Sequence, residues 1–257
     1  MSHERIPVQR VIEKLDRLFD NRDLVGAGRL LDYWRKEAVS LQDFEGELSL
    51  VNEQLGYFRR TNESAKAEEA VTRALFLIDR LGTGDTVSAA TVFLNAATTL
   101  KAFGKAADAL PLYKRCERIY NARLPKDDAL FGGFYNNYGL ALADLCRLEE
   151  AEQVYRKALA VMLARPDGKP EAAITYLNLA YLYAAWIGRP TADVEQCLSA
   201  AETLLFDDSI PKNGHFAFVL SKCAPSFREF GKEAVAVAVE RLGWQVSNLP
   251  TPTNVIF

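Results

Sequence analysis

The sequence is poor in the residues that build most catalytic and metal-binding sites. Its 257 residues include only two histidines, His3 and His215, and neither has a recognisable cysteine, serine or carboxylate partner in the sequence. No zinc-ligand spacing, glycine-rich phosphate loop or serine nucleophile elbow occurs. General acid–base and nucleophilic catalysis depend on such groups acting together. The sequence therefore predicts no catalytic residue, no metal and no cofactor, and hence no enzyme.

Long apolar runs and an excess of one charge are also missing. The sequence contains no segment of about 18 apolar residues, the length that is needed to span a bilayer. The 31 Lys and Arg residues are balanced by 34 Asp and Glu residues, which gives a net charge of -3 without a long run of one sign. Nucleic acids and anionic membranes bind concentrated positive charge. We therefore expect no nucleic-acid or membrane partner, and, because the first residues contain no apolar signal core, a cytoplasmic location.

The four cysteines, Cys116, Cys146, Cys197 and Cys223, include no C-x-x-C pair. All four lie inside helical patterns. We therefore expect small, reduced core residues rather than metal ligands or disulfide partners.

The sequence does contain an internal repeat of about 42 residues. Its clearest copy has this order of large, small and aromatic residues: Tyr135, Tyr138, Gly139, Leu142, Ala151, Tyr155, Ala158 and Leu159. Taking one central residue per copy gives anchors at positions 15, 55, 97, 139, 180 and 224, separated by 40, 42, 42, 41 and 44 residues. Apolar residues at i, i+3, i+4 and i+7 predict two amphipathic helices in each copy. Small residues such as Gly139 and Ala151 would let the paired helices approach, and stacking of the pairs would supply the core.

The repeat resembles the tetratricopeptide repeat (TPR) family. Residues 135 to 159 of this chain match the family signature closely, with Tyr135 in place of the usual Trp. A period near 42 residues is similar to that of the kinesin light chain subtype, since the common repeat has about 34. The resemblance implies an all-α fold, an α-solenoid forming a right-handed superhelix of about six antiparallel helix pairs. It also implies a module for protein–protein interaction.

We expect one solenoid domain over residues 1–244, with weak or capping repeats at 8–41 and 213–243, followed by an extended or mobile tail at 245–257. Pro250 and Pro252 exclude a helix in that tail, and Pro225 should kink or shorten the eleventh helix. The predicted helices span 6–20, 23–40, 44–60, 63–82, 86–103, 105–123, 127–146, 148–164, 170–187, 190–206, 213–230 and 231–243.

Asparagine recurs at one position of three successive repeats, at Asn95, Asn137 and Asn178, while Asn136 and Asn52 lie beside the equivalent position. Asparagine is unfavourable inside a helix, so this ladder needs an explanation. One explanation is that the amides bind the main chain of an extended peptide, since each offers a donor and an acceptor; the resemblance implies this role. The other is that each Asn links neighbouring helices.

Further groove residues are expected on the first helices of the pairs. They are Thr98, Lys101, Tyr181, Arg59 and Arg228. Together with Lys222 on the same inner face, the three cations weakly favour a ligand with carboxylates.

Three functions stay open at this point. The first is a scaffold or adaptor that binds a peptide or protein segment of unknown identity in its concave groove. The second is a peptide-sensing regulatory protein that acts through a partner effector, and the third is a self-assembling structural subunit such as a homodimer. The apolar end of the tail, Val255-Ile256-Phe257, adds the hypothesis that it docks into a groove.

Overall fold

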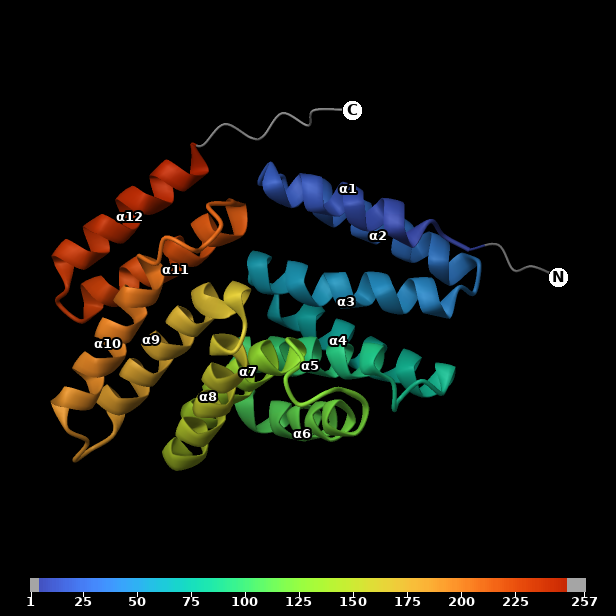
Figure 1. Ribbon diagram of the computed structural model, residues 1–257. Coiled ribbons are helices and arrows are strands. Elements are labelled where there is room, and N and C mark those ends of the chain that lie inside the picture. Colours follow the sequence, from blue (N-terminus) through green and yellow to red (C-terminus); the bar gives the residue numbers. More distant parts are fainter. Residues whose placement is uncertain (1–4, 249–257) are drawn as a thin grey trace. The chain divides into compact units, whose positions relative to one another are not determined.

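The computed structural model describes residues 5–248, which are all-α (Figure 1). The first six helices are α1 (Val8–Asp20), α2 (Leu24–Ser40), α3 (Phe44–Thr61), α4 (Ser64–Leu81), α5 (Val87–Ala102) and α6 (Ala106–Arg123). The others are α7 (Leu130–Asp144), α8 (Leu148–Leu163), the 3-10 turn η1 (Pro166–Gly168), α9 (Lys169–Ala185), α10 (Thr191–Leu205), α11 (Gly214–Glu229) and α12 (Glu233–Ser247). No strand occurs in this part of the chain. The predicted fold class is confirmed.

The chain divides into two compact units, residues 1–125 with α1 to α6 and residues 126–257 with α7 to α12. In the first unit α3 packs on α4 and α5 on α6, and in the second unit α7 packs on α8, α9 on α10 and α11 on α12. The first helices of successive pairs also contact each other: α3 contacts α5, and α9 contacts both α7 and α11. The division falls at Pro125, inside a connection between predicted repeats. A single domain over 1–244 stays a prediction.

The repeat anchors are core residues, as the periodicity predicts. Leu15, Leu55, Ala97 and Ala180 are fully buried, and Ala224 is 1% exposed. At Gly139 the absence of a side chain has a specific use. An added Cβ would lie 2.5 Å from Cε1 of the Tyr155 ring, so the ring of α8 fills the space that glycine leaves on α7. Helices α7 and α8 therefore pack here through the Tyr155 ring on Gly139, and not through direct contact between their backbones.

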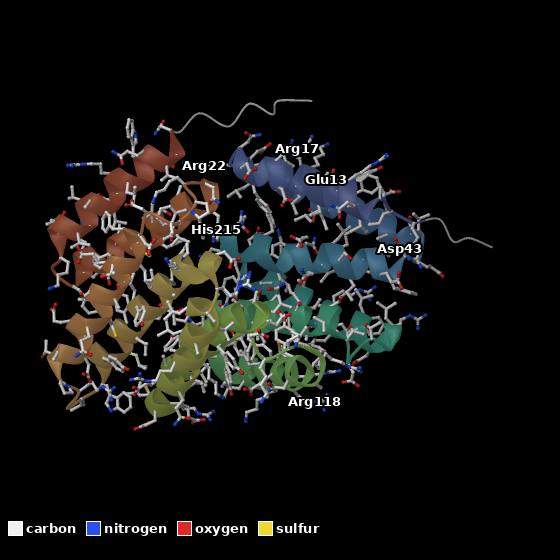
Figure 2. All side chains as sticks on the ribbon, in the orientation of Figure 1. Glu13, Arg17, Arg22, Asp43, Arg118 and His215 are labelled. Atoms are coloured by element: carbon white, nitrogen blue, oxygen red, sulfur yellow. The ribbon has the colours of Figure 1, made fainter. Side chains whose placement is uncertain are left out.

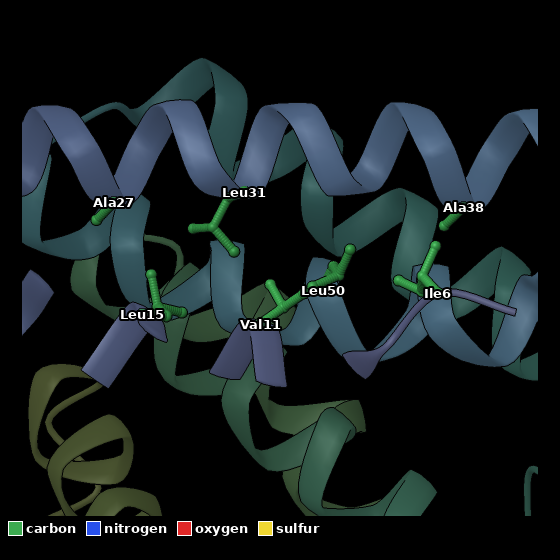
Figure 3. Packing of buried hydrophobic residues seen from close by; sticks show 7 residues of the cluster. All are labelled: Ile6, Val11, Leu15, Ala27, Leu31, Ala38 and Leu50. Carbon is green, nitrogen blue, oxygen red and sulfur yellow. The ribbon is translucent and has the colours of Figure 1, made fainter. Parts of the chain in front are cut away.

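The first repeat, predicted to be weak, has a complete small core. Figure 3 shows this cluster, in which side chains of α1, α2 and α3 meet below α2. The cluster consists of Ile6, Val11, Leu15, Ala27, Leu31, Ala38 and Leu50. Asp43 fixes the entrance to α3, because its carboxylate accepts hydrogen bonds from the backbone N–H groups of Ile6 at 3.1 Å and Gly46 at 3.0 Å.

A buried carboxylate links the helices of the first unit. Glu47 on α3 is 1% exposed, and it accepts hydrogen bonds from Arg73 Nε at 2.7 Å and Nη2 at 2.6 Å. Arg35 Nε on α2 lies 3.7 Å from the same group. The bidentate geometry offsets the cost of burying the charge and ties α3 to α4 and α2.

One predicted boundary, the expected shortening at Pro225 and one cysteine need correction. Helix α12 runs to Ser247 instead of ending near 243, because Val246 is buried against the unit; the rest of the predicted tail, residues 249–257, lies outside the described residues. Helix α11 continues through Pro225, whose side chain is exposed. Cys146 is not a core residue: it is exposed in the α7–α8 turn with φ of 56°, whereas the other three cysteines are buried.

Candidate functional site

In the first unit, two predicted site residues form a pair. Asn95 Nδ2 on α5 donates a hydrogen bond to Asn52 Oδ1 on α3 at 2.9 Å, and both side chains are half-buried. This bond joins the first helices of two successive repeats. Each amide offers two donor hydrogens and an acceptor oxygen. Within the described residues Asn95 Oδ1 accepts no hydrogen bond, so the pair keeps hydrogen-bonding capacity for a ligand.

The second unit contains an equivalent pair, but with different members from those the ladder suggested. Asn178 Nδ2 on α9 donates to Asn136 Oδ1 on α7 at 3.0 Å, and Thr175 Oγ1 donates to the same oxygen at 3.0 Å. Asn137 instead donates to the carbonyl of Gly133 in its own helix at 2.8 Å. The structure therefore brings Asn136 and Asn178 together and leaves Asn137 in a separate contact.

A groove of about 630 Å³ opens beside the Asn52 side chain, between α1, α3 and α5 of the first unit. Its apolar wall includes Leu48 and Val92, and its polar lining includes Asn52, Thr91 and Glu53. Thr91 Oγ1 shares a hydrogen bond with Tyr120 OH of α6 at 3.1 Å, which fixes that side of the groove. The groove has the mixture of apolar surface and few polar groups that suits a ligand.

The charge of this groove is negative. Glu45 and Glu53 line it, and no lysine or arginine among the described residues does so. Glu45 is paired with Arg5 at 2.5 Å on the exposed surface. Glu53 makes no ion pair in the described part of the chain, and its closest polar contact is a long one, from Asn52 Nδ2 at 3.5 Å. Burial raises the pKa of Glu53, although the contact with Asn52 partly opposes this.

Thr98, Lys101 and Arg59 lie near the other ends of α3 and α5. Thr98 Oγ1 donates to the Leu94 carbonyl at 2.8 Å and lies 3.3 Å from Tyr113 OH. Lys101 occupies the last turn of α5. The Nε atom of Arg59 is buried and has no hydrogen-bond partner among residues 5–248, and burial lowers the pKa of this guanidinium.

Tyr181 and Arg228 of the second unit are occupied by neighbours. The Tyr181 hydroxyl donates to Glu229 Oε2 at 2.6 Å, which ties α9 to α11. Arg228 forms ion pairs with Glu233 at 3.1 Å and Glu240 at 3.0 Å, both on α12. These two side chains hold their own unit together, and their polar groups are less available to a ligand than those of the asparagine pairs.

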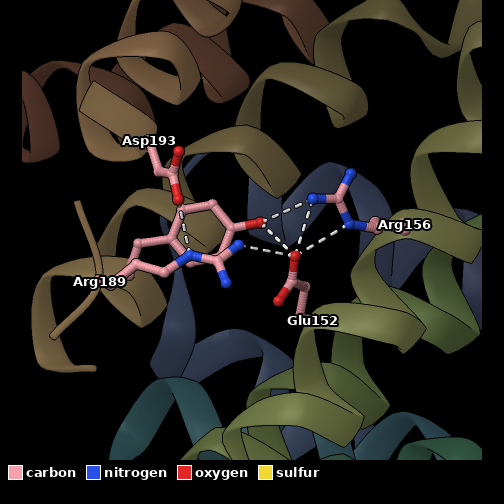
Figure 4. Close-up of polar contacts among 5 residues, drawn as sticks. Glu152, Arg156, Arg189 and Asp193 are labelled. Carbon is pink, nitrogen blue, oxygen red and sulfur yellow. Dashed lines mark hydrogen bonds and ion pairs between the residues drawn. The ribbon is translucent and has the colours of Figure 1, made fainter. Parts of the chain in front are cut away.

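The sequence analysis missed the polar cluster drawn in Figure 4. Glu152 Oε1 on α8 accepts hydrogen bonds from Arg156 Nη2 at 2.7 Å, Tyr183 OH at 2.8 Å and Arg189 Nη2 at 2.9 Å. Asp193 forms an ion pair with Arg189 at 2.7 Å. Burial, followed by the bond to Glu152, raises the pKa of Tyr183 to about 12. The negative charges of the two carboxylates balance the positive charges of the two guanidinium groups. The cluster therefore links α8, α9 and α10 internally.

His215 also has a partner that the sequence did not reveal. It lies near the start of α11, where Figure 2 labels it, and its Nε2 contacts Glu171 Oε1 on α9, 44 residues away in the sequence. The prediction that it has no carboxylate partner was wrong, because only the packing of α9 beside α11 joins the two. His3 lies outside the described residues.

Across residues 5–248, no group of three or more His, Cys, Asp or Glu side chains has the arrangement of a metal site. None of the helices described is long and apolar enough to cross a membrane.

The fold is similar to those of solved helical-repeat proteins. BtubC (BKLC) from P. vanneervenii is 17% identical with a TM-score of 0.53, and the match covers 98% of this chain and 97% of that chain. A kinesin light chain-type protein with TPR-like repeats from Podosopora anserina is 13% identical with a TM-score of 0.53, over 77% of this chain and 93% of that one. A tetratricopeptide repeat protein from Parabacteroides merdae is 18% identical with a TM-score of 0.50, over 95% and 81%.

Comparisons with protein-family models and with curated proteins give no match. The similarity to the solved structures confirms the TPR-like repeat fold that the sequence predicts.

Proposed function

We propose that this chain, whose fold is that of the TPR-like interaction scaffolds, binds an extended segment of a partner polypeptide in the groove between α3 and α5. The observation that carries the proposal is the Asn52–Asn95 amide pair, whose Asn52 member lines a groove large enough for several side chains. A peptide backbone presents one N–H and one C=O per residue, and the pair can meet both. The proposed role is binding without catalysis.

The second unit supports the same interpretation. Its Asn136–Asn178 bond repeats the arrangement of the first pair, 42 residues apart in place of 43. Each unit thus contains an amide pair that can hydrogen-bond to the main chain of a segment bound to that unit. A cytoplasmic location belongs to this proposal, since all four cysteines are free thiols.

The proposal can be tested by selecting peptides from a phage-displayed library of random 12-residue sequences on the immobilised protein. The affinity of the selected peptides for the wild-type protein and for the Asn52→Ala/Asn95→Ala double variant is then measured by fluorescence anisotropy. We expect a loss of at least about tenfold, the effect of about two lost net hydrogen bonds.

Removing both amides together leaves neither with an unsatisfied partner, so the fold should survive. Asn121→Ala is the matched control, because Asn121 is exposed on α6, away from the groove lining. Circular dichroism checks the helix content of each variant. Failure to select any peptide, or equal affinity for the wild type and the double variant, would contradict the proposed function.

A further inference from the structure

The groove between α3 and α5 has a charge opposite to the one that the sequence analysis favoured. Arg59 and Lys101 suggested a ligand with carboxylates, yet neither lines the groove. The charged side chains that do line it are Glu45 and Glu53. The preference of the groove for one kind of ligand therefore depends on these carboxylates and on the apolar wall beside them.

Glu53 is the carboxylate without a counter-ion. Arg60 contributes a favourable field at a distance, but its guanidinium lies over the Phe19 ring, 4.1 Å from the ring centroid. Asp16 of α1 adds a further negative field at Glu53. A half-buried carboxylate with a negative neighbour and no ion pair is a poor arrangement for the free protein. A cation brought by a ligand would improve it.

Glu45 completes the negative end of the groove. Among the residues that the structure describes, it forms an ion pair with Arg5 alone, and both side chains are more than half exposed, so the pair contributes little and a ligand can replace it at small cost. Leu48 and Val92 form an apolar wall in the same groove as these carboxylates and the Asn52 side chain. A segment lying there would meet an apolar surface and a negative charge together.

We infer that the groove selects a partner segment carrying a lysine or arginine next to an apolar side chain, with Glu53 as counter-ion to the cation. The inference rests on the proposed function and names the chemistry of its partner. Charge complementarity is the argument for this occupant: a buried cation–carboxylate pair at an interface is strongly coupled, and acidic segments are repelled by the same groove.

The selection described above tests the inference when it is run in parallel on the wild-type protein and on Glu53→Gln. We expect lysine and arginine to be enriched among peptides selected by the wild type, relative to the starting library, and the enrichment to fall on Glu53→Gln. A selected peptide should bind Glu53→Gln about tenfold more weakly, and replacing its cation by glutamine should cause no additional loss in that variant.

Glu69→Gln is the matched control, because it removes the same charge from an exposed position on α4 outside the groove lining; it should bind as the wild type does. Peptides that depend on Asn52 and Asn95 but show no enrichment of cations, or that bind Glu53→Gln unchanged, would overturn the inference and leave the proposed function standing. If no peptide is selected at all, both are wrong.

Discussion

The space in front of Gly139 allows a sharp test of how α7 and α8 pack. A Cβ at position 139 would lie 2.5 Å from Cε1, 2.7 Å from Cδ1 and 2.9 Å from Cζ of Tyr155. That ring is 1% exposed, so it can move into solvent only by giving up its burial. Gly133, in the same helix, offers a matched comparison, because an added Cβ would meet nothing within 4 Å. The same substitution should therefore have opposite effects at the two positions.

The magnitudes follow from two opposing effects. Replacing a helical glycine by alanine stabilises the helix by about 1 kcal/mol, whereas overfilling a packed core costs about 1–3 kcal/mol. Since three ring carbons are approached too closely, we expect the cost to lie in the upper part of that range, at about 2–3 kcal/mol, so that Gly139→Ala lowers the free energy of unfolding by about 1–2 kcal/mol net. Gly133→Ala should raise it by about 0.5–1 kcal/mol. At about 2 °C per kcal/mol for a chain of this size, Tm falls by about 2–4 °C in the first variant and rises by about 1–2 °C in the second.

Thermal unfolding followed by circular dichroism measures both shifts, and urea unfolding provides an independent free energy. In a Tyr155→Leu background the Gly139→Ala substitution should lose most of its cost, because the clashing ring is gone. Equal shifts of the same sign in the two alanine variants would refute the packing argument, as would an undiminished cost of Gly139→Ala in the Tyr155→Leu background.

Three further predictions concern other individual side chains. Arg73→Met leaves the Glu47 carboxylate buried without its bidentate partner and should destabilise the protein by about 3 kcal/mol in urea unfolding, and Glu47→Gln in the same background should recover part of the loss. The folded-state pKa of Tyr183 is raised to about 12 from 10.0, so its protonated form contributes stability that is complete below pH 10 and lost as the pH rises towards 12; the Tyr183→Phe variant should lack this alkaline loss. Cys146 is the exposed cysteine, so iodoacetamide should modify one thiol in the native protein and four in urea, and a Cys146→Ser variant should resist modification until it unfolds.

The repeat architecture was predictable because the periodic residues are those on which packing depends. The anchors Leu55, Ala97 and Ala180 are all fully buried in the packed helix pairs. Helix ends were predicted to within four residues, the largest difference being at Ser247. That end depends on the burial of Val246, a tertiary contact that the local sequence does not contain.

Contacts between repeats were less predictable. Glu171 and His215 meet across 44 residues, and Glu152 gathers donors from α8, α9 and the turn that follows α9. Each residue alone looks like an ordinary polar side chain on a helix. Only the packing of one first helix against the next decides which polar groups face each other, and a periodic pattern fixes the helices without fixing those pairs.

The asparagine pairs show why the ladder of equivalent positions was incomplete. Equivalent residues on neighbouring parallel helices point in parallel directions and do not face each other; a step of one residue turns the side chain by about 100°. The observed pairs therefore join the residue three before one anchor, Asn52 or Asn136, to the residue two before the next, Asn95 or Asn178.

This geometry also changes the choice between the two explanations of the asparagines. A bond between helices uses one donor and one acceptor of the two amides and fixes the orientation of both side chains. The groups that remain, such as Asn95 Oδ1, are then held in place before a ligand arrives, and less side-chain entropy is lost on binding. Linking the helices and contacting a peptide are therefore compatible roles of one amide pair, and the first makes the second less costly. An amide pair that served only as a link would tolerate replacement by two apolar side chains without any change in peptide affinity, and the Asn52→Ala/Asn95→Ala variant measures that difference.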